Sequence, residues 1–325
     1  MNRLTLVLTS YNRLSFLNVM VESLQKQSNL DFDLIICDNH STDGSWQYID
    51  QIIKFNNGEY VKLCWEDNKG WAGSAERWRD YIRTDWVSIL SDDDWLGVNY
   101  VSCINSVLFN DDFNFMGLIV IGDKRINIEK KYEKDFVYSS KILDIEPAIE
   151  EFYSQKFDVA GISGFVIQSS ILRTGFPRYY DGNGFLEDTL IIYRALLLGG
   201  AMFLSGIHYF RREHLDNISA SNRKSIYYRL ALVRFKHDIK LYAEKACIRK
   251  SLKSKLIRYT IFDHFKGLAV EIFVQNMSLG LYKEYMHNIK RIDMIKFYQS
   301  LGFYPIFYFV YCYKNIKSKI TINRN

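Results

Sequence analysis

The chain has 325 residues, which is enough for about two domains at roughly 100–200 residues each. Its 48% hydrophobic and 24% charged residues are typical of a soluble globular protein and argue against a disordered chain, a collagen-like repeat or a multi-span membrane protein. The net charge of +5 combines two opposed segments: residues 221–325 hold 21 Lys and Arg against 6 Asp and Glu, whereas residues 1–220 hold 21 against 31. Such asymmetry indicates a polyanion or membrane partner for the basic end.

The five cysteines are scattered and form no CxxC pair, so the sequence predicts neither a disulfide framework nor a zinc site, and a reducing cytosol fits best. The apolar run Leu4–Leu8 is too short for a secretory signal and is interpreted as a buried strand. The longest apolar run, Leu301–Tyr313, has 13 residues and falls short of the ~20 that span a bilayer as a helix. No transmembrane segment is predicted.

Up to residue 125, short apolar runs alternate with amphipathic stretches. The predicted strands are Leu4–Thr9, Leu34–Asp38, Tyr60–Trp65, Trp86–Ser91 and Gly117–Gly122. The predicted helices are residues 14–24, Trp46–Phe55 and Ala75–Ile82. This alternation predicts an α/β fold with a mainly parallel sheet and helices on both faces, and ligands bind beyond the carboxyl ends of such strands.

The pattern changes twice further along the chain. Residues 123–221 are less regular, with Gly-rich turns that include residues 161–164 and 181–184 and one apolar helix at Thr189–Leu198. From Asn222 onward the pattern becomes basic and helical. We therefore expect an α/β domain over residues 1–220 and a basic α-helical region over residues 221–325.

Three consecutive carboxylates, Asp92, Asp93 and Asp94, follow the predicted strand Trp86–Ser91. They cannot all ionise side by side unless a cation or hydrogen-bond donors neutralise them. Mg²⁺ or Mn²⁺, held by one or two carboxylates plus substrate phosphate oxygens, is the natural candidate. The alternative is a solvated acidic turn at the start of the next helix.

Three other polar segments lie at element boundaries. Residues 38–45 and residues 68–74 each follow a strand and lead into a helix, and each also fits an ordinary turn and helix cap. Glu187 and Asp188 follow a Gly-rich turn and precede an apolar helix. Either carboxylate fits a general base in a cleft, or a first-turn acid that interacts favourably with the helix dipole.

Together these segments resemble the family 2 glycosyltransferases, which use nucleotide sugars and have the GT-A fold, a Rossmann-like α/β fold with a mainly parallel sheet. The resemblance covers roughly residues 3–220, and its motifs follow one another in the order of the family. The matching segments are Leu6–Arg13, Asp38–Ser45, Asn68–Gly70, Asp92–Asp94, Glu187–Asp188 and Tyr209–Ser219.

The resemblance implies roles for individual residues. Thr9 and Tyr11 match positions that line the nucleotide base and ribose, and Asp38 matches the acid that recognises the base. The donor site implied in this way comprises Thr9, Tyr11, Asn12, Arg13, Asp38, Asn68, Gly70, Asp92, Arg211 and Arg212. The implied metal ligands are Asp93, Asp94 and His214, with Asp93 favoured as the direct ligand. Many relatives have an Arg where this chain has Ala75, and Arg77 is a candidate to replace it.

The implied reaction is a single in-line displacement that inverts the anomeric carbon. A divalent cation, Mn²⁺ or Mg²⁺, with Arg211 or Arg212 would stabilise the leaving diphosphate. Asp188, beside Glu187, would deprotonate the acceptor hydroxyl. The acceptor would be a glycan or a polyprenyl-diphosphate-linked sugar of a bacterial surface polysaccharide such as O-antigen or capsule. The alternatives are a sugar nucleotidyltransferase of similar fold and a non-catalytic nucleotide-sugar-binding or scaffold protein.

The basic C-terminal region has three interpretations. Nucleic-acid binding is disfavoured because residues 1–220 are acidic and no nucleic-acid module is present. A helical bundle that forms a homo-oligomer is the structural alternative. The aromatic residues of the segment 303–313, flanked by Lys296, Lys314, Lys317 and Lys319, are typical of an interfacial segment on an anionic membrane. That last interpretation predicts a cytoplasmic enzyme, peripheral at the cytoplasmic face of the membrane.

Overall fold

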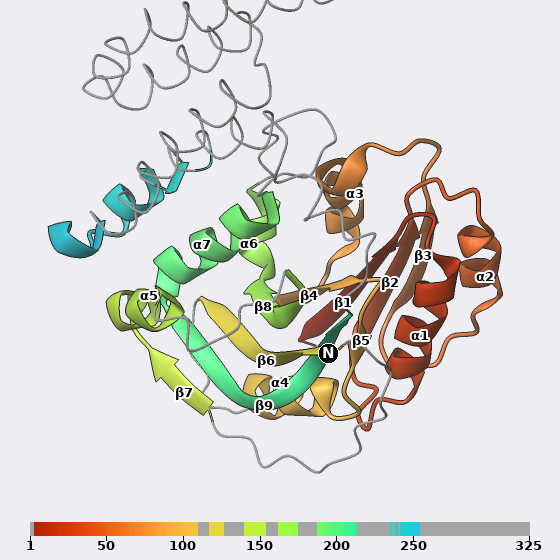
Figure 1. The fold of residues 1–325 in the computed structure, drawn as a ribbon, viewed down its shortest axis with the longest axis horizontal. Coiled ribbons are helices and arrows are strands. Elements are labelled where there is room, and N and C mark those ends of the chain that lie inside the picture. The colour runs from red at the N-terminus through yellow and green to blue at the C-terminus, as the bar shows by residue number, and fades with distance from the viewer. Residues whose placement is uncertain are drawn as a thin grey trace, which may run out of the picture. The chain divides into compact units, whose positions relative to one another are not determined.

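The computed structural model describes residues 3–109, 117–126, 140–153, 162–174 and 187–212, and residues 235, 238–239 and 241–253 of the C-terminal region. The chain divides into two compact units, Met1–Asn217 and Ile218–Asn325. The first unit is an α/β domain built around one mixed sheet (Figure 1).

The elements of the first unit follow the predicted alternation in its N-terminal part. In chain order they are β1 (Leu4–Ser10), α1 (Leu14–Gln25), β2 (Asp33–Asp38), α2 (Ser45–Gln51), β3 (Tyr60–Cys64), α3 (Gly70–Trp78), η1 (Arg79–Tyr81), β4 (Trp86–Ser91), β5 (Trp95–Leu96), α4 (Tyr100–Leu108), β6 (Leu118–Ile126), β7 (Ser140–Leu143), α5 (Ile145–Tyr153), η2 (Ile162–Gly164), β8 (Phe165–Gln168), α6 (Ser169–Arg173), α7 (Glu187–Gly199) and β9 (Ala201–Arg212).

The first half of the sheet is parallel. Its strands run in the order β3-β2-β1-β4, with β1 hydrogen-bonded to β2 on one side and to β4 on the other. The carboxyl ends of β1, β2 and β4 therefore meet at one edge, where Ser10, Asp38 and Ser91 are the last strand residues. The prediction that the polar segments gather at this edge is confirmed for the segments after β1, β2 and β4.

The second half of the sheet is mixed. β8 is antiparallel to both β4 and β6, β9 is parallel to β6, and β5 and β7 are antiparallel to β9. The sequence did not predict β8 or β7 because runs of four residues are too short to show an alternating pattern. β6 and β9 pair around a register shift between Ile121 and Asp123, which bends the sheet at that point.

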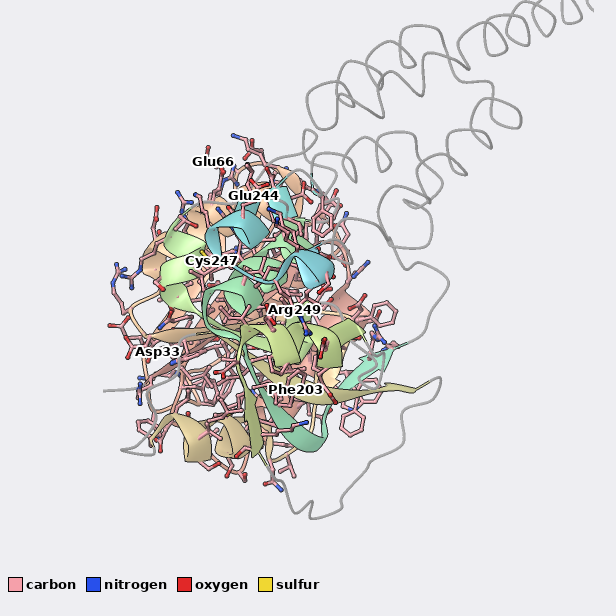
Figure 2. The ribbon with its side chains drawn as sticks, turned by 90° about the vertical axis from the view of Figure 1, so that its left-hand side faces the viewer. Asp33, Glu66, Phe203, Glu244, Cys247 and Arg249 are labelled. Carbon is pink, nitrogen blue, oxygen red and sulfur yellow. The ribbon has the colours of Figure 1, made fainter. Side chains whose placement is uncertain are left out.

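Apolar side chains fill both faces of the sheet. Leu6 and Leu8 of β1 pack with Leu17 and Val21 of α1 in one buried cluster that also includes residues of α2 and α4. On α3, Ala75 and Trp78 are fully buried. Burying one such side chain contributes about 1.5–3 kcal/mol, so the layers stabilise the edge that carries the polar loops. Figure 2 marks Asp33, where β2 begins, and Phe203, a β9 residue that is only 3% exposed.

Two predicted helices differ from the structure at their ends. The helix predicted at Ala75–Ile82 begins earlier, at Gly70, and ends at Trp78, where η1 continues the turn. Gly70 has φ 69°, a left-handed conformation that glycine adopts without strain, and its N–H is bound by Asn68 Oδ1 at 2.8 Å. The helix predicted at Trp46–Phe55 ends at Gln51, because Ile52 is already extended.

Candidate active site

The acidic turn, Asp92–Asp94, directly follows β4 and is buried. The three residues are 4%, 9% and 5% exposed, so the predicted alternative of a solvated acidic turn does not describe them. Carboxylates removed from water must be neutralised by protons, by cations or by hydrogen-bond donors. The turn therefore needs partners from other elements.

Arg13, in the loop between β1 and α1, supplies a positive charge. Its Nη1 donates to Asp92 Oδ1 at 3.2 Å and to Asp93 Oδ2 at 2.9 Å. The backbone N–H of Tyr11 in the same loop points at Asp92 Oδ2 at 3.3 Å. The β1 loop and the acidic turn thus form one charged cluster at the carboxyl edge of the sheet.

Asp94 is held from the other side by β9. The Tyr209 hydroxyl donates to Asp94 Oδ2, and the backbone N–H of Arg212 donates to Asp94 Oδ1 at 2.9 Å. The Arg212 side chain donates from Nε to the Asp93 carbonyl oxygen at 3.1 Å. The end of β9, from Tyr209 to Arg212, therefore reaches the acidic turn.

Crowding of carboxylates in a buried place shifts their titration. Burial and repulsion by Asp93 together raise the pKa of Asp92 to about 6, although the positive charge of Arg13 opposes that rise. Burial and the neighbouring charge of Asp93 raise the pKa of Asp94 to about 7, although hydrogen bonds from Tyr209 and Arg212 oppose that rise. Ionisation of all three acids of the buried turn is therefore unfavourable, and a bound cation would favour their charged forms.

The oxygen donors of the turn fit a hard divalent cation. Among the described residues no cluster of three or more His, Cys, Asp or Glu side chains comes together as a metal site. Mg²⁺ and Mn²⁺ do not need one, since one or two carboxylates and the phosphates of a nucleotide suffice. Asp93 is the most exposed of the three acids, with Ser91 Oγ and Arg13 as its hydrogen-bond donors. His214 lies outside the described residues.

Asp38, at the end of β2, is fully buried and carries one oxygen without a hydrogen bond. Its Oδ2 accepts the backbone N–H of Ser41 at 2.7 Å, whereas its Oδ1 has no partner. A buried acceptor that is left unpaired costs free energy, and a ligand that donates to it recovers that cost. The position fits an acceptor for an N–H group of a nucleotide base.

Asn12 ties the loops after β1 and β2 together. Its N–H donates to Ser41 Oγ at 2.8 Å, and its Oδ1 accepts the N–H of Thr42 at 2.7 Å. Its φ of 51° is left-handed, a conformation that Asn tolerates better than most residues. Asn12 thereby shapes the loop that carries Tyr11 and Arg13. Tyr11 is 43% exposed. Thr9 is half-buried in β1 beside Ser91 of β4.

Asn68 connects the loop before α3 to the end of β2. Its Oδ1 accepts from the N–H of Gly70 and, at 2.7 Å, from Asn39 Nδ2. Arg77 of α3 binds Asp67 and lies over the Trp65 ring, with its guanidinium carbon 5.1 Å from the ring centroid. Both partners of Arg77, Asp67 and Trp65, precede α3 in the chain, in the segment that joins β3 to α3.

Glu187 and Asp188 are the first two residues of α7, and α7 contacts η2. η2 is hydrogen-bonded to the end of β4, because Ser163 Oγ accepts the N–H of Ser91 at 3.1 Å. Glu187 is 1% exposed, whereas Asp188 is half-buried. Burial raises the pKa of Asp188, and hydrogen bonds from Thr189 N and Oγ1 to its Oδ1 oppose that rise.

Sequence patterns did not identify every residue of the site. Tyr209 contacts Asp94 of the acidic turn from 115 residues further along the chain, and Ser163 binds Ser91, just before the turn, from 72 residues further along. The sequence assigned no role in the site to either side chain. The Gly-rich turns at 181–184 and the C-terminal aromatic segment lie outside the described residues.

The sequence also matches a known protein family. The family described as "Glycosyl transferase family 2" matches residues 5–176, which is more than half of the chain. The chain belongs to the family 2 glycosyltransferases. This assignment favours a glycosyltransferase over the nucleotidyltransferase alternative, and the expected family is confirmed.

Part of this family 2 glycosyltransferase is also similar to a teichoic acid polymerase. It is 31% identical over 96 residues to the "Teichoic acid poly(glycerol phosphate) polymerase" of Staphylococcus epidermidis. The match covers 30% of this chain and 13% of the polymerase. The chain thus spans a small part of that relative's length.

Solved structures share the fold. S. aureus TarS 1–349 in complex with UDP-GlcNAc has a TM-score of 0.66 at 15% identity, over 90% of this chain and 80% of that one. The mannosyltransferase PcManGT from Pyrobaculum calidifontis, in complex with GDP-Man and Mn²⁺, has a TM-score of 0.51 at 11% identity, over 98% of this chain and 88% of that one. The predicted GT-A fold of this family 2 glycosyltransferase is confirmed. None of the helices in the described part of the chain is long and apolar enough to cross a membrane.

Proposed function

We propose that this glycosyltransferase moves a sugar from a nucleotide-diphosphate sugar to a hydroxyl of a glycan or lipid-linked acceptor, with inversion and with a divalent cation. The buried acidic turn beside Arg13, at the carboxyl edge of the parallel strands, carries the proposal. It combines hard oxygen ligands with a fixed positive charge, which is the combination that a diphosphate and its cation require.

Within this proposal the donor nucleotide lies along the loops after β1, β2 and β3. Asp38 binds the base through its unpaired Oδ1, and Thr9 and Tyr11 line the base and ribose. Asn12, Asn68 and Gly70 shape these loops through the hydrogen bonds described above. The uridine and guanosine diphosphate sugars bound by TarS and PcManGT are the first donors to test.

Asp93 is the proposed metal ligand, together with diphosphate oxygens, and His214 remains a second candidate. When bound, the cation would stabilise the negative charge that develops on the departing diphosphate. Arg13 orients Asp93 and Asp92, and Arg211 is the proposed side-chain counter-charge for the diphosphate.

Asp188 is the proposed general base. Asp188 is a half-buried residue in the first turn of α7, whereas Glu187 beside it is only 1% exposed. The raised pKa of Asp188 brings it closer to the working pH, which suits a group that must take a proton from a hydroxyl. As Asp188 takes that proton, the acceptor oxygen bonds to the anomeric carbon on the side opposite the diphosphate, whose bond to that carbon breaks, and this in-line displacement inverts the anomeric carbon.

The acceptor is proposed to belong to a bacterial surface polymer. The similarity to a poly(glycerol phosphate) polymerase supports teichoic-acid-type polyol phosphates as test acceptors, beside polyprenyl-diphosphate-linked sugars. The basic region 221–325 is proposed to hold the enzyme at the anionic cytoplasmic face of the membrane, where such acceptors are found, with homo-oligomer formation as its alternative role.

A thermal-shift screen of UDP, GDP and their sugars, with Mn²⁺, Mg²⁺ or EDTA, tests donor and metal together. A ligand that binds only the folded state raises the midpoint of unfolding. We expect one nucleotide to stabilise the protein more with metal than with EDTA. Absence of any nucleotide-dependent shift would contradict the proposal.

A further inference from the structure

We propose that Tyr209 and Arg212, at the end of β9, are positioning residues that hold the acidic turn in its donor-binding conformation, and that Arg212 acts through Asp93 and does not bind the diphosphate itself. The inference rests on the proposed function, because it assigns the turn to the diphosphate and its cation. It reassigns Arg212, which the family resemblance had placed among the donor-binding residues.

Asp94 is the point where β9 holds the turn. Its two carboxylate oxygens accept from two β9 donors, the Tyr209 hydroxyl and the Arg212 N–H. Tyr209 and Asp94 are 1% and 5% exposed, so water does not compete for these hydrogen bonds. Asp94 therefore anchors the turn. Asp93, the most exposed of the three acids, is the one that faces the ligand in this proposal.

The Arg212 guanidinium contacts the acidic turn and two aromatic rings. Its Nε donates to the Asp93 carbonyl oxygen at 3.1 Å. Its guanidinium carbon lies 4.7 Å from the centroid of the Phe16 ring on α1 and 5.5 Å from that of Trp95 on β5. Only a planar guanidinium can lie against aromatic rings with its face and donate a hydrogen bond from its edge, and lysine has no such group.

Strand pairing fixes the chain immediately after the turn. Trp95 and Leu96 of β5 pair with Phe210 and Tyr209 of β9. The rings of Trp95 and Phe210 also stack, with centroids 5.5 Å apart and planes 12° apart. The backbone of the acidic turn is thus tied to β9 on its carboxyl side, so a shift of β9 would move Asp93.

Groups that orient a metal ligand without touching the metal typically change metal affinity or activity about 10–100-fold when they are removed. We therefore expect Tyr209→Phe and Arg212→Lys each to weaken nucleotide diphosphate binding in Mn²⁺ by about 10–100-fold. Binding in EDTA depends on the base and ribose loops, whereas the hydrogen bonds of Tyr209 and Arg212 described above go to the acidic turn, so this binding is expected to stay at the wild-type value.

Arg212→Lys separates the two roles of the arginine because it keeps the positive charge and removes the planar donor. Arg3→Lys is its control, since Arg3 also donates to a main-chain carbonyl, that of Leu108, but lies at the start of β1. Tyr60→Phe is the control for Tyr209→Phe, because the Tyr60 hydroxyl also donates to an oxygen of the protein, the Ile52 carbonyl at 3.5 Å, but Tyr60 begins β3 at the opposite end from the carboxyl edge.

Isothermal titration of UDP and GDP into full-length wild type and the four variants, in Mn²⁺ and in EDTA, is the test. The proposal requires weaker binding in Mn²⁺ alone for both site variants, with both controls at the wild-type values. Wild-type affinity for Arg212→Lys in Mn²⁺ would show that charge suffices and would overturn the role of Arg212. Equal weakening in EDTA and Mn²⁺ would indicate direct contact or general disruption, and would also overturn it.

Tyr209→Phe is checked for folding by circular dichroism, and if it does not fold, Arg212→Lys decides the proposal. A wild-type protein that binds neither nucleotide would contradict the proposed function instead, which separates the two failures.

Discussion

Replacing Arg13 by methionine removes the positive charge that bridges two buried carboxylates. Arg13 lies 3.2 Å from Asp92 and 2.9 Å from Asp93, and its side chain is only 19% exposed. Removing one partner of a buried ion pair typically costs about 3–5 kcal/mol, because the remaining charge is left uncompensated. Since Asp92 and Asp93 keep other hydrogen bonds, we expect Arg13→Met to lower the free energy of unfolding by about 2–4 kcal/mol at pH 7.5.

The pH dependence follows from the raised pKa of Asp92. The pKa of Asp92 is about 6 in the folded protein and near its ordinary value of 3.8 when unfolded, so its ionisation destabilises the fold as the pH rises through that window. Loss of Arg13 raises the folded pKa further, and the cost of Arg13→Met should therefore be largest above pH 7 and should shrink at pH 5, where Asp92 is protonated in both proteins.

Urea unfolding followed by tryptophan fluorescence at pH 5 and pH 7.5 measures this cost. Arg79→Met is the control, because Arg79 pairs at 3.6 Å with Asp80, whose side chain is 78% exposed, and such pairs contribute at most about 1 kcal/mol. If Arg13→Met behaved as Arg79→Met does, or if its cost were the same at both pH values, the reasoning about the acidic turn would be refuted.

Three further predictions concern the donor, the base and the membrane. Asp38→Asn should weaken nucleotide binding about 10-fold or more, which is the loss expected for a hydrogen bond to a charged group. Asp33→Asn, at the other end of β2, should leave nucleotide binding unchanged. Equal affinities of the two variants in calorimetry would exclude Asp38 as the hydrogen-bond acceptor for the nucleotide base. Because burial raises the pKa of Asp188, and a general base works only when deprotonated, kcat/KM should fall with decreasing pH at a higher pH than for an ordinary Asp; a rate that stays constant down to pH 4.5 would contradict this assignment. Full-length protein should co-sediment with anionic vesicles at low salt and lose that binding when residues 301–325 are removed; equal sedimentation of both would argue against membrane attachment by this segment.

The N-terminal half of the fold could be predicted because its signals are local. β1, β2 and β4 are runs of apolar residues that are buried on both faces, and each is followed by polar residues where the strand ends. The sequence alone therefore predicts that the acidic turn and Asp38 lie at the same edge of the sheet.

The partners of the acidic turn could not be predicted in the same way. Tyr209 lies in a long strand of ordinary apolar character, and only the pairing of β5 with β9 brings its hydroxyl to Asp94. The proposed positioning role of Arg212 could not be predicted either, because the sequence shows its positive charge but not the rings of Phe16 and Trp95 that lie beside it.

The separation of donor binding from sugar transfer in Asp188→Asn tests the central claim most directly. The substitution keeps an oxygen that can accept from Thr189, so the start of α7 should remain intact. Transfer from the donor found in the nucleotide screen to polyprenyl-linked and polyol phosphate acceptors is measured beside donor affinity. The account predicts wild-type donor affinity with transfer reduced by at least about 100-fold, within the ~10²–10⁴-fold range of general base catalysis. Full transfer activity in Asp188→Asn would contradict it.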